Sequence, residues 1–185
     1  LLLDDMRAER RIDGPHGALI FRAGGEHAEL PEPPEPVVRR LGVEQSNTSM
    51  TIGREVIVKL YRRLQSGVHP EVEVGRFLTD VGGFANTPPL LGSLEWVDDA
   101  GQPTAIAAAF GFVLNQGDGW SYTIEFLERE LEPVVLAAAA SEEETASAVS
   151  ESGVFALFGD FARRLGTRTA DLHRAFAVAT RSEER

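Results

Sequence analysis

The 185-residue chain contains no cysteine, so it can form neither a disulfide framework nor a thiolate metal site. It has no apolar run close to the roughly 20 residues that a membrane-spanning helix needs, and no secretory signal pattern opens the sequence. Its 18 Lys and Arg stand against 29 Asp and Glu, and the formal net charge of -11 argues against nucleic acid and anionic membrane as partners. We therefore expect a soluble, cytoplasmic protein.

Lysine is almost absent as well. Lys59 is the one lysine of the chain, and every other basic residue counted in its charge is arginine. A codon bias toward arginine explains most of this skew, but it explains neither why one lysine remains nor where that lysine lies. Hydrophobic residues make up 43% and charged residues 25% of the chain, which is ordinary for one globular domain, or two small ones, with a core.

Several motifs of familiar catalytic sites are missing. The sequence has no GxxxxGK[ST] loop, no GxGxxG loop and no HExxH helix, so P-loop, dinucleotide-binding and zinc-protease chemistry are unsupported. The histidines are too scattered in sequence to predict a metal site, and we predict none: His16, His27, His69 and His173.

The chain opens with the pattern of a short helix, and apolar runs with period two then predict a series of strands. A proline-rich connector over 30–36 and a polar loop over 45–49 separate the early strands. The predicted strands are His16–Phe21, Val37–Leu41, Glu55–Tyr61, Leu90–Val97 and Thr104–Val113.

Helical patterns follow. Pro70 at a first-turn position, acidic residues after it and Gly82-Gly83 at the end predict a helix over 70–81. Residues 120–131 also have a helical pattern, and residues 137–152 contain few large apolar residues, which predicts a solvated helix or a linker. An apolar stripe along one face predicts a long final helix: Val154, Phe158, Phe161, Leu165, Leu172 and Phe176.

The order of these elements indicates a kinase. In the small lobe of such an enzyme, a strand lysine binds the α- and β-phosphates of ATP, and a glutamate from the following helix holds that lysine in place. Lys59 lies on the predicted strand 55–61, on the face that it shares with Ile57 and Tyr61. The plain alternative is a lysine at the end of a strand that reaches solvent along its own stem.

Two stretches carry a closer resemblance. Residues 44–80 (EQSNTSMTIGREVIVKLYRRLQSGVHPEVEVGRFLTD) and 112–120 (FVLNQGDGW) resemble bacterial maltokinases, which belong to the aminoglycoside-phosphotransferase-like kinases and are sometimes fused to trehalose synthase. The resemblance covers nearly the whole chain and is weakest over 10–40 and 133–152. It implies transfer of the ATP γ-phosphate to maltose, giving maltose 1-phosphate for α-glucan and glycogen synthesis.

The resemblance also implies a site. Lys59 matches the phosphate-binding lysine of the family, and Glu73 its helix partner, with Glu71 as the alternative. The segment 46–49 takes the place of a glycine-rich loop, and 110–113 that of the hinge that meets the adenine edge. Phe110-Gly111 departs from the more polar residues expected there. The residues implied to bind ATP are Lys59, Glu73, Ser46, Asn47, Thr48, Ser49, Gly111 and Val113.

The post-hinge motif of the family is matched by Asn115, Gln116, Asp118 and Trp120, with no role assigned to each. A kinase of this group also needs a large lobe with a catalytic Asp after a His-Gly-Asp-like motif and a second Asp that binds Mg²⁺. Neither motif occurs in the 185 residues. We therefore expect no catalytic residue and no Mg²⁺ ligand in this chain, and no phosphoryl transfer by it alone.

The expected fold is α+β: a kinase-like N-lobe with a mostly antiparallel sheet and one packed helix, preceded by part of a β-rich cap and followed by helices. The expected boundaries are 1–44 for the cap, 45–118 for the N-lobe and 119–185 for the helical segment. Three alternatives stay open. They are another small-molecule kinase, such as a glucokinase; a non-catalytic interaction module that docks with an enzyme such as trehalose synthase; and a globular domain in which Lys59 and Glu73 never meet.

Overall fold

The computed structural model describes residues 2–25, 31, 37–42, 47–138 and 154–178. The chain divides into two compact units, Leu1–Leu114 with Leu172–Arg185, and Asn115–Asp171. None of the described helices is long and apolar enough to cross a membrane.

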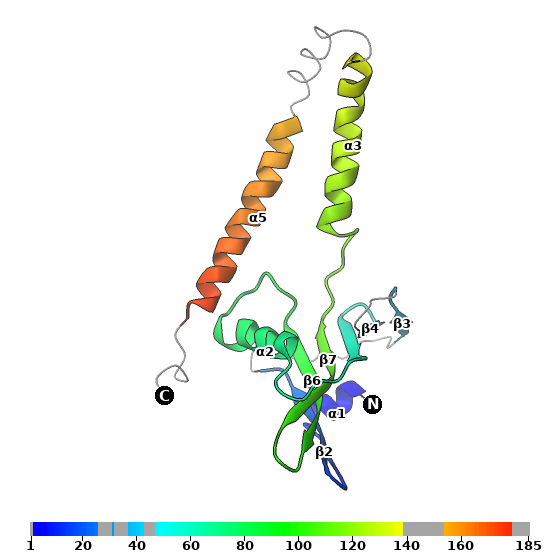
Figure 1. The fold of residues 1–185 in the computed structure, drawn as a ribbon, viewed down its shortest axis with the longest axis vertical. Helices are drawn as coiled ribbons and strands as arrows, with labels where there is room; N and C mark the ends of the chain where they lie inside the picture. The colour runs from blue at the N-terminus through cyan, green and yellow to red at the C-terminus, as the bar shows by residue number, and fades with distance from the viewer. Residues whose placement is uncertain (1, 26–30, 32–36, 43–46, 139–153, 179–185) are drawn as a thin grey trace. The chain divides into compact units, whose positions relative to one another are not determined.

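The first unit is built on a seven-stranded sheet with the order β1-β2-β6-β7-β5-β4-β3 (Figure 1). Every neighbouring pair of strands is antiparallel. The strands are β1 (Arg11–Gly14), β2 (Gly17–Ala23), β3 (Val38–Arg40), β4 (Asn47–Ile52), β5 (Val56–Tyr61), β6 (Leu90–Asp98) and β7 (Pro103–Gly111).

One helix packs on each face of this sheet. Leu3 and Met6 of α1 (Leu2–Arg7) pack with Phe21 and Val58 of the sheet, on what we call the α1 face. Val72 of α2 (Pro70–Arg76) packs on the opposite side, the α2 face, which includes Ala108 and Phe110 of β7. Burial of both apolar clusters removes apolar surface from water, and this is what holds the three layers together.

Asp98 fixes the turn of the β6–β7 hairpin. The Oδ1 atom of Asp98 accepts hydrogen bonds from the backbone N–H of Ala100 (2.9 Å) and of Gln102 (2.8 Å). An aspartate that satisfies backbone donors two to four residues ahead fixes a tight turn. The turn sets the register of β7, and β7 in turn pairs with β5, the strand that carries Lys59.

The helix predicted over 70–81 is present. It starts at Pro70, after His69 in the N-cap position, and continues from α2 into a π-helical turn, η1 (Phe77–Val81). Gly75 allows the close approach to the sheet, because a Cβ there would lie 3.1 Å from Cε1 of Phe110. Gly83 follows with a φ of +57°, a conformation that glycine adopts without strain and that ends the helix.

The second unit contains two helical segments, which are α3 (Gly119–Ala138) and most of α5 (Val154–Phe176). Part of the predicted aromatic stripe packs between them: Phe158 lies 5.6 Å from Phe126, and Phe161 lies 5.4 Å from Tyr122, between ring centroids. In the first unit, the end of α5 places Phe176 5.8 Å from Phe77. Leu165 of the same stripe is exposed, and the side chain of Val154 lies outside the described residues.

Some expectations need correction or lie outside the described residues. β1 was not predicted, because all its residues are exposed and its sequence has no apolar alternation. The helix predicted over 120–131 is longer, since α3 reaches Ala138. Residues 32–36 of the proline-rich connector and 139–152 of the polar segment lie outside the described residues.

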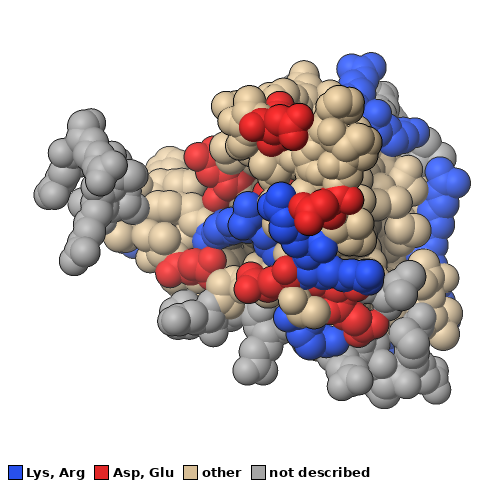
Figure 2. Space-filling model, turned by 90° about the horizontal axis from the view of Figure 1, so that it is seen from below, with Lys and Arg blue, Asp and Glu red and all other residues tan. Residues whose placement is uncertain are grey.

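Charged side chains of both signs lie next to one another on the face of the molecule that Figure 2 presents. The described ion pairs of α1 and β1 are of this kind, with N–O distances of 3.0 Å for Arg7–Asp4, 3.0 Å for Arg10–Asp5 and 2.7 Å for Arg11–Asp13. Such exposed pairs contribute little stability.

Candidate functional site

Lys59 lies on the α2 face of the sheet, in the middle of three paired strands. Its backbone stands opposite Ser49 of β4 on one side and opposite Ala108 of β7 on the other. Its ammonium group lies 5.6 Å from the centroid of the Phe110 ring, and its side chain is 26% exposed. A cation so far withdrawn from water needs a partner of opposite charge.

That partner is Glu71. The Nζ atom of Lys59 donates to Oε1 of Glu71, and the two side chains form an ion pair. The expectation that Glu73 would be the partner is therefore wrong. An α-helix turns by about 100° per residue, so side chains two positions apart point in nearly opposite directions. Since Val72 and Gly75 face the sheet, Glu71 points to Lys59 and Glu73 points away from it.

Two residues that sequence analysis missed hold Glu71 in position. The hydroxyl of Tyr61 donates to Oε2 of Glu71 at 2.9 Å, so both carboxylate oxygens are engaged. The ring of Tyr61 stacks on His69 with the centroids 4.0 Å apart, and Nδ1 of His69 accepts from the backbone N–H of Glu71 at 3.3 Å. The signals were present in the sequence: Tyr61 shares a strand face with Lys59, and His69 directly precedes the helix proline.

Burial raises the pKa of the Tyr61 hydroxyl well above its usual range, and the negative charge of Glu71 adds to that rise. The hydroxyl therefore stays protonated and keeps donating to Glu71. Because Tyr61 lies on β5 and Glu71 on α2, this hydrogen bond joins the helix to the strand that carries Lys59.

The segment 46–49, expected to form a phosphate-binding loop, is mostly strand. Asn47, Thr48 and Ser49 belong to β4, because this strand pairs with β3 on one side and with β5 on the other. Ser49 and Asn47 stand opposite Lys59 and Tyr61, on the α2 face, whereas Thr48 stands opposite Leu60 on the α1 face. Ser46 lies outside the described residues.

Two polar atoms beside Lys59 have no partner within the described part of the chain. Oδ1 of Asn47 and Oγ of Ser49 are buried, and neither makes a hydrogen bond there. Buried polar atoms without partners are costly, so they commonly mark a place where a ligand or water binds. The α2 face next to Lys59 thus offers a cation and two unsatisfied polar groups.

The predicted hinge lies at the end of β7. The backbone N–H of Gly111 donates to the carbonyl of Pro89 (3.0 Å), and that of Phe112 donates to the carbonyl of Glu55 (2.7 Å). Val113 is 57% exposed. The structure therefore places Gly111 and Val113 at the strand end, and the N–H groups of Gly111 and Phe112 are already engaged there.

The post-hinge motif lies in the second unit, where Asp118 stabilises the start of α3. Its carboxylate accepts from the backbone N–H of Ser121 at 2.8 Å and from the Ser121 hydroxyl at 3.0 Å, and these hydrogen bonds hold the pKa of Asp118 below its usual range. Oδ1 of Asn115 accepts from the N–H of Gly117 at 3.2 Å. Trp120 is 75% exposed.

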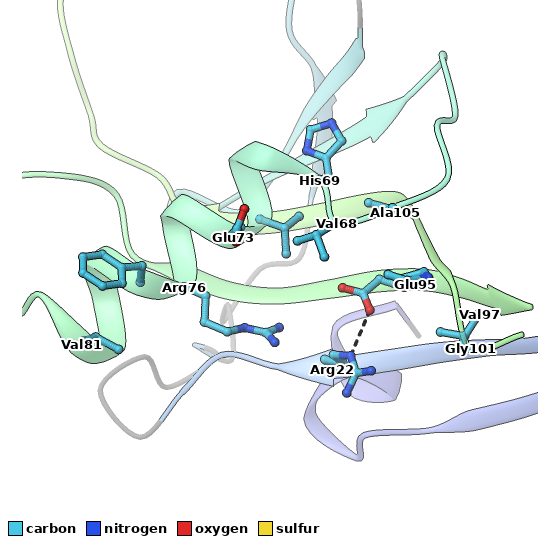
Figure 3. A pocket seen from close by; sticks show the side chains of 14 residues that line it. Arg22, Val68, His69, Glu73, Arg76, Val81, Glu95, Val97, Gly101 and Ala105 are labelled. Carbon is cyan, nitrogen blue, oxygen red and sulfur yellow. Dashed lines mark hydrogen bonds and ion pairs between the residues drawn. The ribbon is translucent and has the colours of Figure 1, made fainter. Parts of the chain in front are cut away.

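A pocket of about 540 Å³ opens elsewhere on the α2 face (Figure 3). Strands β2, β6 and β7 form its floor, and α2 with η1 forms a wall. Glu73 lines this pocket, as do Arg76 of the same helix and the ion pair of Arg22 with Glu95 (3.0 Å). Lys59 and Glu71 do not line it.

The described residues do not fit a metal centre, since no three His, Asp or Glu side chains among them converge on one point. The expected absence of Mg²⁺ ligands from the whole chain stays a prediction. The chemistry that the described site can perform is to bind an anion through the ammonium of Lys59, which Glu71 and Tyr61 hold in position.

No family model matches the chain. Among solved structures, it is similar to a glucosamine kinase in complex with glucosamine, ADP and inorganic phosphate, with 23% identity and a TM-score of 0.55 over 95% of this chain. Two further crystal forms of glucosamine kinase match at 23% and 22% identity, with TM-scores of 0.53 and 0.55. The chain spans about a third of the length of these kinases, 34% to 36%. The likeness confirms the predicted fold class, α+β with a kinase-like antiparallel sheet.

Proposed function

We propose that this chain is the ATP-binding part of a sugar kinase. The observation that carries the proposal is the ion pair of Lys59 with Glu71, between a sheet strand and the helix that packs on it. In kinases, such a pair fixes the lysine that binds the α- and β-phosphates of ATP. The kinase-like fold, which places this pair on a single sheet face, supports the same proposal.

In this proposal, Lys59 neutralises charge on the ATP phosphates while the γ-phosphate passes to a sugar hydroxyl. Glu71 holds the ammonium, and Tyr61 holds Glu71. Ser49 and Asn47 present polar atoms on the same sheet face as the ammonium. Ser46, which lies outside the described residues, is part of the same proposal. We assign adenine recognition to the end of β7 and the residues directly after it, which include Gly111 and Val113.

The proposed reaction needs groups that the described residues do not supply. A base must take the proton of the sugar hydroxyl, and Mg²⁺ must compensate charge on the phosphates. We propose that the base and the ligands of Mg²⁺ belong to a part of the protein outside this chain, and that the 185 residues alone bind nucleotide without transferring phosphate. We also propose the domain boundaries 1–44, 45–118 and 119–185.

For the sugar, we propose maltose, on the sequence resemblance to maltokinases. Maltose 1-phosphate would then enter α-glucan and glycogen synthesis in the cytoplasm, and association or fusion with trehalose synthase is part of the same proposal. A second candidate is glucosamine, which the solved kinase of similar fold holds together with ADP.

The test is a phosphoryl-transfer assay on the complete gene product and, separately, on the 185-residue chain. The complete protein receives ATP with maltose, glucosamine or glucose, and formation of the sugar phosphate and ADP is measured. Preference for maltose by kcat/KM supports the first candidate, and preference for glucosamine supports the second. If the complete protein phosphorylates no sugar, the proposed function is wrong. If the isolated chain transfers phosphate at the rate of the complete protein, its proposed incompleteness is wrong.

A further inference from the structure

The pocket beside α2 has the dimensions and the lining of a small-molecule site. Its volume of about 540 Å³ lies within the range of roughly 300–1,000 Å³ that is usual for such sites. Much of its surface is apolar, from Val72, Phe77, Val97 and Ala105 among others. A few polar side chains reach into it from two sides, which is the other usual property of a binding pocket.

The floor of the pocket carries a fixed guanidinium group. Nε of Arg22 donates to Oε2 of Glu95 at 3.0 Å, and Oε1 of Glu95 accepts from the hydroxyl of Ser93 at 3.2 Å. Glu95 is thus held on both oxygens, and its side chain is only 12% exposed. The two terminal nitrogens of Arg22 have no acceptor within the described residues and remain able to donate.

The wall carries a second guanidinium group, that of Arg76, for which the structure gives no hydrogen bond or ion pair among the described residues. Figure 3 shows the side chain of Arg76 extending from α2 into the pocket, toward the side of Arg22. Nη2 of Arg76 is buried and makes no hydrogen bond within the described part of the chain. Glu73 lies three positions earlier on the same helix, but the structure gives no ion pair between these two described residues. A buried donor on a permanently charged group is a strong demand for an anionic acceptor.

We propose that this pocket binds an organic anion: a ligand with an apolar body and one carboxylate or phosphate group. The apolar body contacts Val72, Val97 and Ala105, and the anionic group accepts hydrogen bonds from Arg76 and from the terminal nitrogens of Arg22. The proposal does not rest on the proposed kinase function: neither Lys59 nor Glu71 lines the pocket, and of the two residues that hold Glu71 in position only His69 does.

The test uses three probes that share an aromatic body. 4-Phenylbutyrate carries a carboxylate, phenyl phosphate carries a phosphate, and 4-phenylbutyramide is neutral. Each is titrated into the 185-residue chain while the methyl resonances of Val72, Val97 and Ala105 are followed by NMR. We expect saturable shifts at millimolar concentrations with at least one of the anions and none with the amide. Comparison of the two anions decides between carboxylate and phosphate.

Two variants and a matched control locate the binding. Arg76→Gln and Arg22→Gln each remove one guanidinium group, and we expect each to weaken binding about tenfold or more. Arg63→Gln removes the same charge from an exposed position outside the pocket and should leave the affinity unchanged. A variant is folded if its remaining methyl resonances keep their dispersion. If Arg76→Gln does not fold, the affinity of Arg22→Gln alone decides whether the pocket binds the anion.

Four results would overturn the proposal. They are no saturable shift with either anion, equal binding of the neutral amide, shifts confined to residues outside the pocket, or unchanged affinity in a folded Arg76→Gln or Arg22→Gln variant. A titration of ATP tests the proposed function separately from the pocket. ATP is expected to shift resonances of β4 and β5 and to leave those of Val97 and Ala105 unchanged.

Discussion

Glu71 forms an ion pair with Lys59, which lies twelve positions earlier in the sequence. The other carboxylate oxygen of Glu71 accepts a hydrogen bond from the hydroxyl of Tyr61 at 2.9 Å. One carboxylate therefore connects the first turn of α2 to the strand that carries the single lysine of the chain. This arrangement determines where the ammonium of Lys59 points.

The choice of Glu71 over Glu73 can be tested by a matched pair of variants. Glu71→Gln removes the charge that faces Lys59, and we expect kcat/KM for ATP in the complete protein to fall about tenfold or more. Glu73→Gln removes the same charge from the same helix on the side away from Lys59, and we expect less than about a twofold change. Steady-state kinetics at several ATP concentrations provide the comparison. The opposite ranking would restore Glu73 as the partner.

Tyr61 should make stability depend on alkaline pH. Its hydroxyl has a raised pKa in the folded chain, so the folded state holds a proton that the unfolded state loses above the ordinary tyrosine pKa of about 10. The associated stability is fully present below pH 10 and is lost as the pH rises through the folded value. We expect the free energy of unfolding, measured with urea at pH 8 and at pH 11, to fall more between these two pH values for the parent chain than for Tyr61→Phe.

A direct readout of the same group is available, because the chain contains two tyrosines. In Tyr122→Phe, Tyr61 is the remaining tyrosine, and phenolate absorbance then reports on it alone. We expect that absorbance to develop only when the chain unfolds. Ionisation of Tyr61 near pH 10 in a chain that is still folded would contradict the account.

Thr79 should contribute to the attachment of the helix to the sheet. Its buried hydroxyl donates to the carbonyl of Gly75 at 2.8 Å and accepts from the backbone N–H of Leu90 at 3.1 Å. Thr79→Val keeps the shape but leaves the N–H of Leu90 without its acceptor, which should lower the free energy of unfolding by about 1–3 kcal/mol. Thr79→Ser keeps the hydroxyl and should lower the free energy of unfolding by less than Thr79→Val does. Equal stability of the valine and serine variants would exclude this role.

Asp118 should stabilise the start of α3. Its carboxylate accepts two hydrogen bonds from Ser121. We therefore expect Asp118→Ala to lower the thermal midpoint of the helical signal in far-UV circular dichroism, and Asp118→Asn to lower that midpoint less. Its pKa is lowered in the folded chain, so this stabilisation is present above the ordinary aspartate pKa of about 4 and is lost as the pH falls through the folded value. A thermal midpoint of Asp118→Ala equal to that of the parent chain would contradict this.

Much of the central fold was predictable from sequence, because its elements have a clear apolar period. β5, β6 and β7 have apolar patterns bounded by turn residues, and α2 has a proline at its start and glycines at its end. β4 was missed for a physical reason. Its buried residues on the α2 face are Asn47, Ser49 and Thr51, so the alternation is present in burial but absent in hydrophobicity.

The site was predictable only in part. The sequence predicted that Lys59 lies on a strand of the sheet and is the cation of the site. The choice between Glu71 and Glu73 as its partner depended on the rotation of α2 about its axis. That rotation is fixed by contacts that no local pattern reveals, namely those of Val72 and Gly75 with the sheet. The contribution of Tyr61 depends on the same packing, since its hydroxyl reaches Glu71 only when α2 has this orientation.

The central claim is that Lys59, held by Glu71, binds the phosphates of a nucleotide. The most direct measurement is isothermal titration of ATP into the 185-residue chain and into its Lys59→Met variant, with circular dichroism to establish that both are folded. The account predicts saturable binding to the parent chain and affinity at least about tenfold weaker in the variant. Lys59→Arg should also bind weakly, because a planar guanidinium does not replace a compact ammonium. Equal affinity of ATP for the parent chain and a folded Lys59→Met variant would contradict the claim.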